Sequence, residues 1–232
     1  MDKLLLWVSI FTSLLSEAFA QADLKSKVFV FPRESETDHV KLIPHLEKPL
    51  QNFTLCFRTY SELSRSHSLF SYSVRGKDNE LLIYKERVGE YSLYIGNSKV
   101  TVHSVEEYLS PVHLCTTWES SSGIAEFWVN GKPLVKKGLQ RGYTVQAPPS
   151  IILGQEQDSY GGRFQKSQSF VGEFADLYMW DYVLTPQDIL LAYRDFPINP
   201  NIIDWQALKY EINGYVLIRP RVWDIDLNNK MR

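Results

Sequence analysis

Two carboxylates lie close together in the stretch GQEQDSYGG, residues 154–162. Glu156 stands between two glutamines, and Asp158 follows two residues later. Like charges this close repel each other unless something positive lies between them. Calcium accepts about six to eight oxygens from carboxylates, side-chain amides and backbone carbonyls. The stretch therefore predicts part of a calcium site, with a solvated acidic loop as the alternative.

Two further loops offer oxygen ligands of the same kinds. Asp78 and Asn79 follow each other in RGKDNE, at a turn that borders a predicted strand. Gln168 lies in FQKSQSF, shortly after the acidic stretch. One loop cannot fill the coordination sphere of calcium alone, so a complete site needs these loops to meet. Spacing along the chain does not show whether they do.

An enzyme is the main competing interpretation, namely a jelly-roll glycoside hydrolase that uses Glu156 and Asp158. Such enzymes place two carboxyl groups about 5–5.5 Å or about 6.5–9.5 Å apart. The E-x-D-x-x-E pattern of jelly-roll glucanases is broken, because Gly161 occupies the last position. Glu173 and Asp176 form a second pair, but their spacing along a strand predicts opposite faces. The sequence contains no G-x-S-x-G, H-E-x-x-H, C-x-x-C or P-loop motif, so we expect no catalytic residues.

The N-terminus has the pattern of a secretory signal. Lys3 precedes a mostly apolar segment over residues 4–15, and AFA at 18–20 is a small-x-small ending. This pattern predicts a cleaved signal peptide over residues 1–20 and a secreted, extracellular protein. No later run reaches about 18 apolar residues, so we expect a soluble mature protein without a transmembrane segment. The formal net charge of −2 lacks the strongly basic character typical of nucleic-acid binding.

Two cysteines and one sequon fit the same compartment. An even number of cysteines in a secreted chain predicts a disulfide between Cys56 and Cys115, with two buried free thiols as the alternative. Each cysteine falls opposite the main apolar set of its strand, which is consistent with a bridge between neighbouring strands. Closing a loop of this length stabilises the fold by about 4 kcal/mol in the chain-entropy model. Asn52 begins the sequon NFT and is predicted to be glycosylated at the surface.

The rest of the chain must position these groups. It consists mostly of short stretches in which apolar and polar residues alternate. Ten predicted strands cover residues 27–31, 52–60, 67–74, 80–86, 91–96, 112–120, 125–131, 150–154, 172–181 and 215–223. Many short strands with few helical stretches predict an all-β, two-sheet sandwich or jelly roll. The exception is TPQDILLAYRDF, where Thr185 as N-cap predicts a short α-helix near 186–194, lying on one sheet.

One predicted strand carries a family signature. Residues 113–120 read HLCTTWES and resemble the pentraxin signature H-x-C-x-[ST]-W-x-S. The resemblance extends over about residues 26–223 and includes the stretches FVFPRESETDHVKL and ILGQEQDSYGG. It implies a pentraxin domain over residues 21–223, built as a lectin-like jelly roll of the concanavalin type with one disulfide and one helix. The tail, residues 224–232, runs past the usual end of the family and has no predicted role.

The resemblance implies that the three oxygen-bearing loops meet around two calcium ions per subunit. The ligands of the first ion would be Asp78, Asn79, Glu156, Asp158 and the backbone carbonyl of Gln157. The ligands of the second ion would be Glu156, Asp158 and Gln168. In the branch of the family that this chain most resembles, positions matching Leu82, Tyr84 and Tyr94 form a hydrophobic pocket beside the calcium pair. Asn79 contacts the ligand there.

The resemblance also implies a role in innate immunity without enzymatic activity. Pentraxins form flat cyclic pentamers, so we expect a homopentamer, or two stacked pentamers as a decamer. A ring that presents weak calcium-bridged sites on one face gains about 10²–10⁴-fold in avidity for repetitive surfaces. The implied ligands are phosphoethanolamine, acidic glycans and glycosaminoglycans, DNA and chromatin, and amyloid fibrils. The opposite face would be available to complement and Fc receptors.

Overall fold

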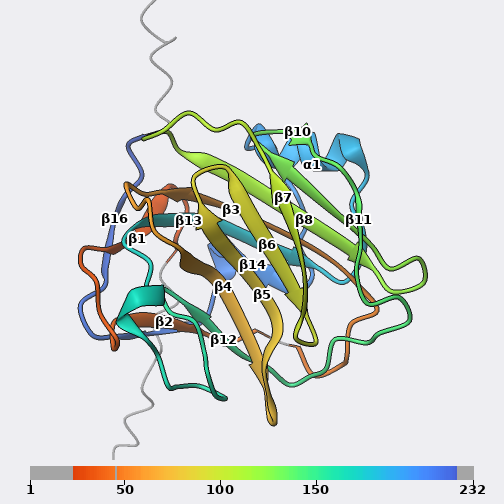
Figure 1. The fold of residues 1–232 in the computed structure, drawn as a ribbon. Coiled ribbons are helices and arrows are strands. Elements are labelled where there is room, and N and C mark those ends of the chain that lie inside the picture. The colour runs from red at the N-terminus through yellow and green to blue at the C-terminus, as the bar shows by residue number, and fades with distance from the viewer. Residues whose placement is uncertain (1–22, 45, 224–232) are drawn as a thin grey trace, which may run out of the picture.

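Two antiparallel β-sheets pack face to face in this computed structural model, which describes residues 23–44 and 46–223 (Figure 1). Sheet A has the strand order β10-β9-β8-β3-β13-β1-β16, and sheet B has the order β15-β2-β12-β4-β5-β6-β7. Strands that are neighbours in space are often distant in sequence, as for β12 between β2 and β4. The predicted signal peptide and the C-terminal tail lie outside the described residues.

The strands of sheet A are β1 (Lys27–Phe31), β3 (Asn52–Tyr60), β8 (Val112–Glu119), β9 (Ile124–Val129), β10 (Lys132–Pro133), β13 (Gly172–Trp180) and β16 (Leu217–Pro220), with β11 (Lys137–Gly138) paired to β9 and β14 (Ile203–Asp204) paired to β13. The strands of sheet B are β2 (His39–Leu42), β4 (His67–Val74), β5 (Lys77–Arg87), β6 (Glu90–Ile95), β7 (Ser98–His103), β12 (Ser150–Leu153) and β15 (Tyr210–Asn213). The helical segments are η1 (Lys166–Gln168), α1 (Pro186–Tyr193) and η2 (Trp205–Ala207).

The predicted fold class is confirmed, and each of the ten predicted strands is present within a few residues of its predicted bounds. Six short strands were not predicted, namely β2, β7, β10, β11, β14 and β15. Most of them lie at or near the margins of the sheets, where a strand of two to six residues carries little hydrophobic periodicity.

Alternation along β3 decides which side chains enter the core. Phe53, Leu55 and Phe57 are fully buried between the sheets, where they belong to the main hydrophobic cluster. Cys56 points the other way, into a smaller buried cluster on the outer face of sheet A. It lies directly opposite Cys115 on β8, and the two form the predicted disulfide.

Helix α1 covers this disulfide on the outer face of sheet A. Ile189 from the helix packs with the two cysteines, Trp128 and Trp180 in one buried cluster. The Thr185 hydroxyl accepts a hydrogen bond from the backbone NH of Asp188 at 3.2 Å, as an N-cap does. The helix therefore begins at residue 186, as predicted, and ends one residue before the predicted end.

A β-bulge in β13 overturns the prediction that Glu173 and Asp176 lie on opposite faces. The register with β3 shifts between Ala175 and Tyr178, and Asp176 has a left-handed φ of 53°. Such a bulge adds a residue to one strand and breaks the simple alternation of side chains. Glu173 accepts a hydrogen bond from Trp223 Nε1 at 2.5 Å, and Asp176 is paired with Arg221, whose guanidinium lies over the Trp223 ring. Both carboxylates therefore reach one cluster.

Candidate metal and ligand site

Three separate segments of the chain meet at the outer side of sheet B. Asp78 and Asn79 open β5, Glu156 and Asp158 lie in the loop after β12, and Gln168 ends η1. Burial raises the pKa of Glu156, and the negative charges of Asp158 and Asp78 raise it further. Side-chain hydrogen bonds from Asn79 and Gln168 act against this shift, so the other four residues lie around the carboxylate of Glu156. The three loops therefore come together in the structure, which their spacing along the sequence could not show.

Three buried oxygens at this meeting point have no hydrogen-bond partner among the described residues. They are Asn79 Oδ1, Glu156 Oε2 and Gln168 Oε1, one from each segment. A buried polar atom without a partner is costly, so a group of them calls for an unseen partner such as an ion. One carboxylate and two amide oxygens are the donor set of a hard cation, and calcium fits it.

The Gln157 side chain attaches the loop after β12 to sheet B. Its Nε2 donates to the carbonyl of Ser71 at 3.0 Å and to that of Ser150 at 3.1 Å, while its Oε1 accepts from the NH of Gly161 at 2.9 Å. Its own NH donates to the Ser71 hydroxyl at 3.1 Å. These bonds occupy the side chain and the NH, so the side chain of Gln157 acts as an anchor for its loop.

Gln155 anchors the same loop on its other side. Its Nε2 donates to the carbonyls of Ser35 at 2.7 Å and Asp38 at 3.1 Å, and the residue is completely buried. Asp158 accepts from Gln165 Nε2 at 2.5 Å, which ties the acidic loop to the start of η1. The two glutamines around Glu156 therefore have structural side-chain roles, which the sequence did not reveal.

The start of β5 is held by a buried carboxylate that the sequence analysis missed. Glu80 is completely buried and accepts hydrogen bonds from the Tyr143 hydroxyl at 2.8 Å and from the NH of Gln146 at 2.6 Å. Lys77 pairs with it at 3.5 Å. Asp78 and Asn79 lie between these two residues, so the network fixes the strand from which they project. A glutamate in a β-strand beside two polar residues gave no signal that it would be buried.

The predicted hydrophobic pocket residues share the outer face of sheet B. Leu82 pairs with Tyr94 across β5 and β6, and Tyr84 follows two residues after Leu82. Leu82 and Tyr84 are buried but belong to neither hydrophobic cluster, while Tyr94 is partly exposed. Burial raises the pKa of Tyr84, and the negative charge of Glu156 adds to it, which places this tyrosine near the acidic loop.

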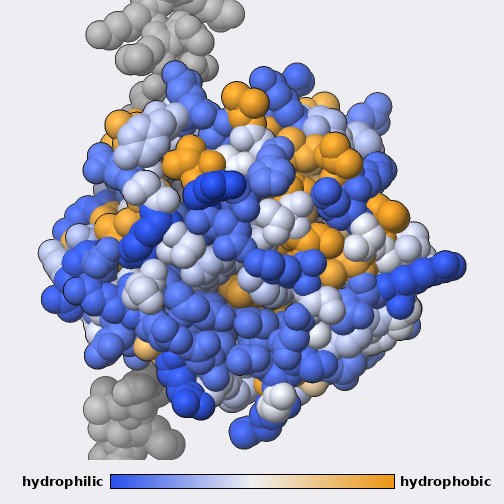
Figure 2. Space-filling view, viewed as in Figure 1, coloured by the Kyte–Doolittle hydropathy of each residue, from blue (hydrophilic) through white to orange (hydrophobic). Residues whose placement is uncertain are grey.

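The surface around the site is polar. The hairpin between β4 and β5, from which Asp78 and Asn79 come, lies at the bottom of Figure 1. In the same view, the lower part of the surface in Figure 2 is almost entirely hydrophilic, and hydrophobic residues gather in the upper right. A hydrophilic surface with a few apolar walls suits a polar or charged ligand better than an apolar one.

A second group of potential metal ligands is not available to bind an ion. Cys56, His113 and Cys115 lie within 4.8 Å of one another and are buried, but the two sulfurs form the disulfide. Burial lowers the pKa of His113 to about 3, and its ring packs against Tyr193. This histidine belongs to the packing of the signature strand and offers no ligand site.

Comparison with known proteins places the chain in a family. The sequence model of the Pentaxin family matches residues 27–220. The serum amyloid P-component of Mus musculus is 85% identical over 224 residues, which cover 97% of this chain and 100% of that protein. The serum amyloid P-component of Homo sapiens is 70% identical over 223 residues, which cover 96% of this chain and 100% of that protein.

A solved structure supports the fold. The native heptameric SAP-like pentraxin from Limulus polyphemus superposes with a TM-score of 0.77 at 22% identity, over 85% of this chain and 96% of that one. Across the described residues, no helix is long and apolar enough to cross a membrane. With the family match over most of its length and relatives this similar, the chain belongs to the Pentaxin family.

Proposed function

We propose that the chain is a secreted, calcium-dependent pattern-recognition protein that binds anionic ligands through a two-calcium site. Pentraxins in general bind calcium and act as recognition proteins. The observation that carries the proposal is the set of three unpartnered buried oxygens, one from each converging segment. Asp78, Asn79, Glu156, Asp158 and the carbonyl of Gln157 would hold one ion, and Glu156, Asp158 and Gln168 would hold the other.

The chemistry of these residues explains the type of ligand. Bound calcium would offset the repulsion among the carboxylates and supply positive charge for an anionic oxygen of the ligand. Leu82, Tyr84 and Tyr94 add an apolar wall, which suits a methyl or methylene group next to a carboxylate or phosphate. Asn79 would contact the ligand directly. Phosphoethanolamine, acidic carbohydrates and glycosaminoglycans have this combination of charge and short apolar parts.

Assembly would turn weak sites into tight binding. The related Limulus protein is heptameric, and we propose a cyclic homopentamer, single or stacked, for this chain. Several sites on one face would engage repetitive surfaces such as chromatin DNA or amyloid fibrils, with an avidity gain of about 10²–10⁴. The opposite face would be open to complement and Fc receptors. The names of the relatives as serum proteins fit secretion, and Asn52, partly exposed at the start of β3, is proposed as a glycosylation site.

The experiment that tests this proposal is retention on phosphoethanolamine-agarose. We expect the protein to be retained in millimolar calcium and released sharply by EDTA. Glu156→Gln should abolish retention, whereas Glu107→Gln, the same charge change at an exposed position, should not. Glu107 borders Val88 beyond the far end of β5, so it leaves the site intact. Passage of the wild-type protein in calcium would contradict the proposal.

The hydrolase interpretation does not survive the family assignment. Pentraxins and their serum amyloid P-component members are recognition proteins without enzymatic activity. The expectation that the chain is not an enzyme is therefore confirmed, and the carboxylates Glu156 and Asp158 need no catalytic role.

A further inference from the structure

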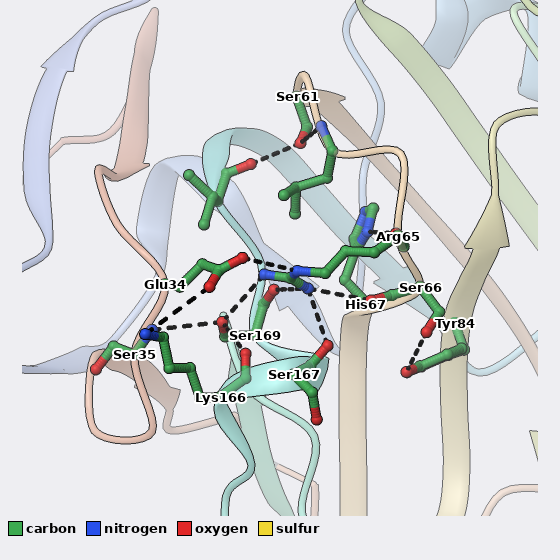
Figure 3. A network of polar contacts seen from close by, with 12 residues as sticks. Glu34, Ser35, Ser61, Arg65, Ser66, His67, Tyr84, Lys166, Ser167 and Ser169 are labelled. Carbon is green, nitrogen blue, oxygen red and sulfur yellow. Dashed lines mark hydrogen bonds and ion pairs between the residues drawn. The ribbon is translucent and has the colours of Figure 1, made fainter.

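Arg65 lies at the centre of a polar network that holds η1 in place (Figure 3). It belongs to the connection between β3 and β4, and its Nε donates to Glu34 Oε1 at 2.9 Å. Its Nη1 lies 3.0 Å from the carbonyl of Ser167 and 2.8 Å from the carbonyl of Ser169. These two residues flank Gln168 directly. One guanidinium therefore contacts the backbone on both sides of a residue with an unpartnered buried oxygen.

Segment η1 has few other contacts that could fix its position. It contains three residues, none of them buried, and its N-cap residue makes no side-chain capping bond. Ser169, just past its end, is buried; its hydroxyl donates to the carbonyl of Lys166 at 2.7 Å and accepts from the NH of Ser35 at 3.4 Å. A single 3-10 turn is not stable by itself, so its geometry depends on such tertiary contacts.

The same connection also reaches the apolar wall of the ligand site. Ser66 follows Arg65, and its carbonyl lies 3.1 Å from Arg65 Nη1. The Ser66 hydroxyl accepts a hydrogen bond from the Tyr84 hydroxyl at 3.2 Å. In Figure 3, Arg65 stands between η1 on one side and Ser66 with Tyr84 on the other. A displacement of the guanidinium would therefore affect both the calcium ligand and the pocket wall.

We propose that Arg65 is a positioning residue for the second calcium site, setting the place of Gln168 and linking it to Tyr84. This inference rests on the proposed function, because it takes Gln168 as a ligand of the second ion. Arginine suits this role, since its planar guanidinium carries five N–H donors in a fixed arrangement. A lysine at this position would keep the charge but lose the planar fork, in which Nε bonds to Glu34 while Nη1 reaches Ser167 and Ser169.

Calcium titration by calorimetry tests the proposal with Arg65→Lys and Arg65→Gln. We expect affinity for the second ion to fall about 10–100-fold, the usual effect of losing a group that orients a metal ligand. Affinity for the first ion should stay within about twofold of the wild type. Arg163→Gln is the matched control, since Arg163 is an exposed arginine in the same loop region. Unchanged affinity for both ions in Arg65→Lys, or an equal loss for both, would overturn the proposal.

Two further measurements separate positioning from general damage. In a double-mutant cycle with Gln168→Ala, the losses should not add, because both changes remove the same ligand; fully additive losses would contradict the proposal. In calcium-free protein, amide hydrogen exchange should speed up over residues 166–170 in Arg65→Gln and stay unchanged in sheet A.

If the wild type binds no calcium, the proposed function fails, while the exchange experiment still decides whether Arg65 holds η1. If Arg65→Gln does not fold, Arg65→Lys gives the answer.

Discussion

Both sides of the sandwich carry clustered carboxylates, but the two clusters are neutralised in different ways. At the outer face of sheet A, Asp176 and Asp195 are each paired with both Arg58 and Arg221. The protein supplies two guanidinium groups for two carboxylates. At the outer side of sheet B, no lysine or arginine within residues 23–44 and 46–223 forms an ion pair with Glu156 or Asp158.

The difference indicates what each cluster is for. A carboxylate group compensated from within the chain is part of the fold and needs no external partner. A group that brings Glu156, Asp158 and Asp78 together without an internal cation stays destabilised until a cation binds from solution. The missing counter-ion on sheet B therefore supports the calcium site that we propose, and that the clustered carboxylates of the sequence already suggested.

The largest expected effect comes from breaking the compensated cluster. Arg58→Ala leaves the buried Asp176 with one guanidinium in place of two and removes the 2.5 Å hydrogen bond from Arg58 to the Tyr193 carbonyl. We expect the free energy of unfolding to fall by about 4 kcal/mol, measured by urea denaturation. Arg219→Ala, at an exposed arginine of β16, should change it by less than about 0.5 kcal/mol. A loss below about 1 kcal/mol for Arg58→Ala would show that Arg221 compensates alone.

A smaller effect is expected at Glu156, where substitution should lower the stability of the protein in calcium but raise it without calcium. Calcium at a hundredfold excess over its Kd should stabilise the wild type by about 3 kcal/mol, and EDTA should reverse this. Glu156→Gln should lose that gain, yet be more stable than the wild type without calcium by about 0.5–1 kcal/mol, because one repelling charge is gone. Thermal unfolding in calcium and in EDTA measures both. If the variant were less stable in EDTA as well, the carboxylates would not be repelling each other in the metal-free protein.

The smallest effect concerns pH in the calcium-free protein. The pKa of Glu156 is raised in the folded state, so the folded protein gains stability as pH falls through that raised pKa toward the ordinary value. The advantage of Glu156→Gln should therefore disappear on acidification. Asp38 behaves oppositely, because its hydrogen bond from Arg33 lowers its pKa to about 2. The stability that Asp38 contributes to the folded state is therefore present above its ordinary pKa and is lost as pH falls toward about 2.

The control for this experiment is Asp38→Asn, measured beside Glu156→Gln in urea unfolding between neutral and acidic pH. Asp38→Asn should be less stable than the wild type at neutral pH, with a deficit that shrinks only at strongly acidic pH. A neutral-pH advantage of Glu156→Gln that persists unchanged at acidic pH would contradict the raised pKa of that carboxyl.

Local sequence patterns were sufficient to predict those structural features that depend on a single strand or turn. The alternation of Phe53, Leu55 and Phe57 against Cys56 predicted both the core face of β3 and the side of the disulfide. Thr185 predicted the start of α1. Where alternation was broken locally, the prediction was wrong: the bulge that places Asp176 in the cluster of Arg221 has no clear signature in GEFADLYMW.

The sequence analysis did not predict contacts between residues that are distant along the chain. Gln155 and Gln157 look like ligand amides, but their side chains are used as anchors to Ser35, Ser71 and neighbouring backbone. Arg65 carried no signal at all, because the two carbonyls that link it to η1, those of Ser167 and Ser169, lie more than a hundred residues further along the chain. Hydrogen bonds of this kind depend on which loops the strand order brings together.

The sequence by itself determined the chemical types at the site and the elements that carry them: oxygen-bearing side chains at strand ends, a two-sheet β-fold, one disulfide and one helix. It could do so because side-chain periodicity, capping and ligand chemistry are local properties. Only the tertiary structure decided that Asn79, Glu156 and Gln168 meet with unpartnered oxygens and no internal cation. That outcome depends on β12 entering sheet B between β2 and β4, a long-range pairing that no local pattern contains.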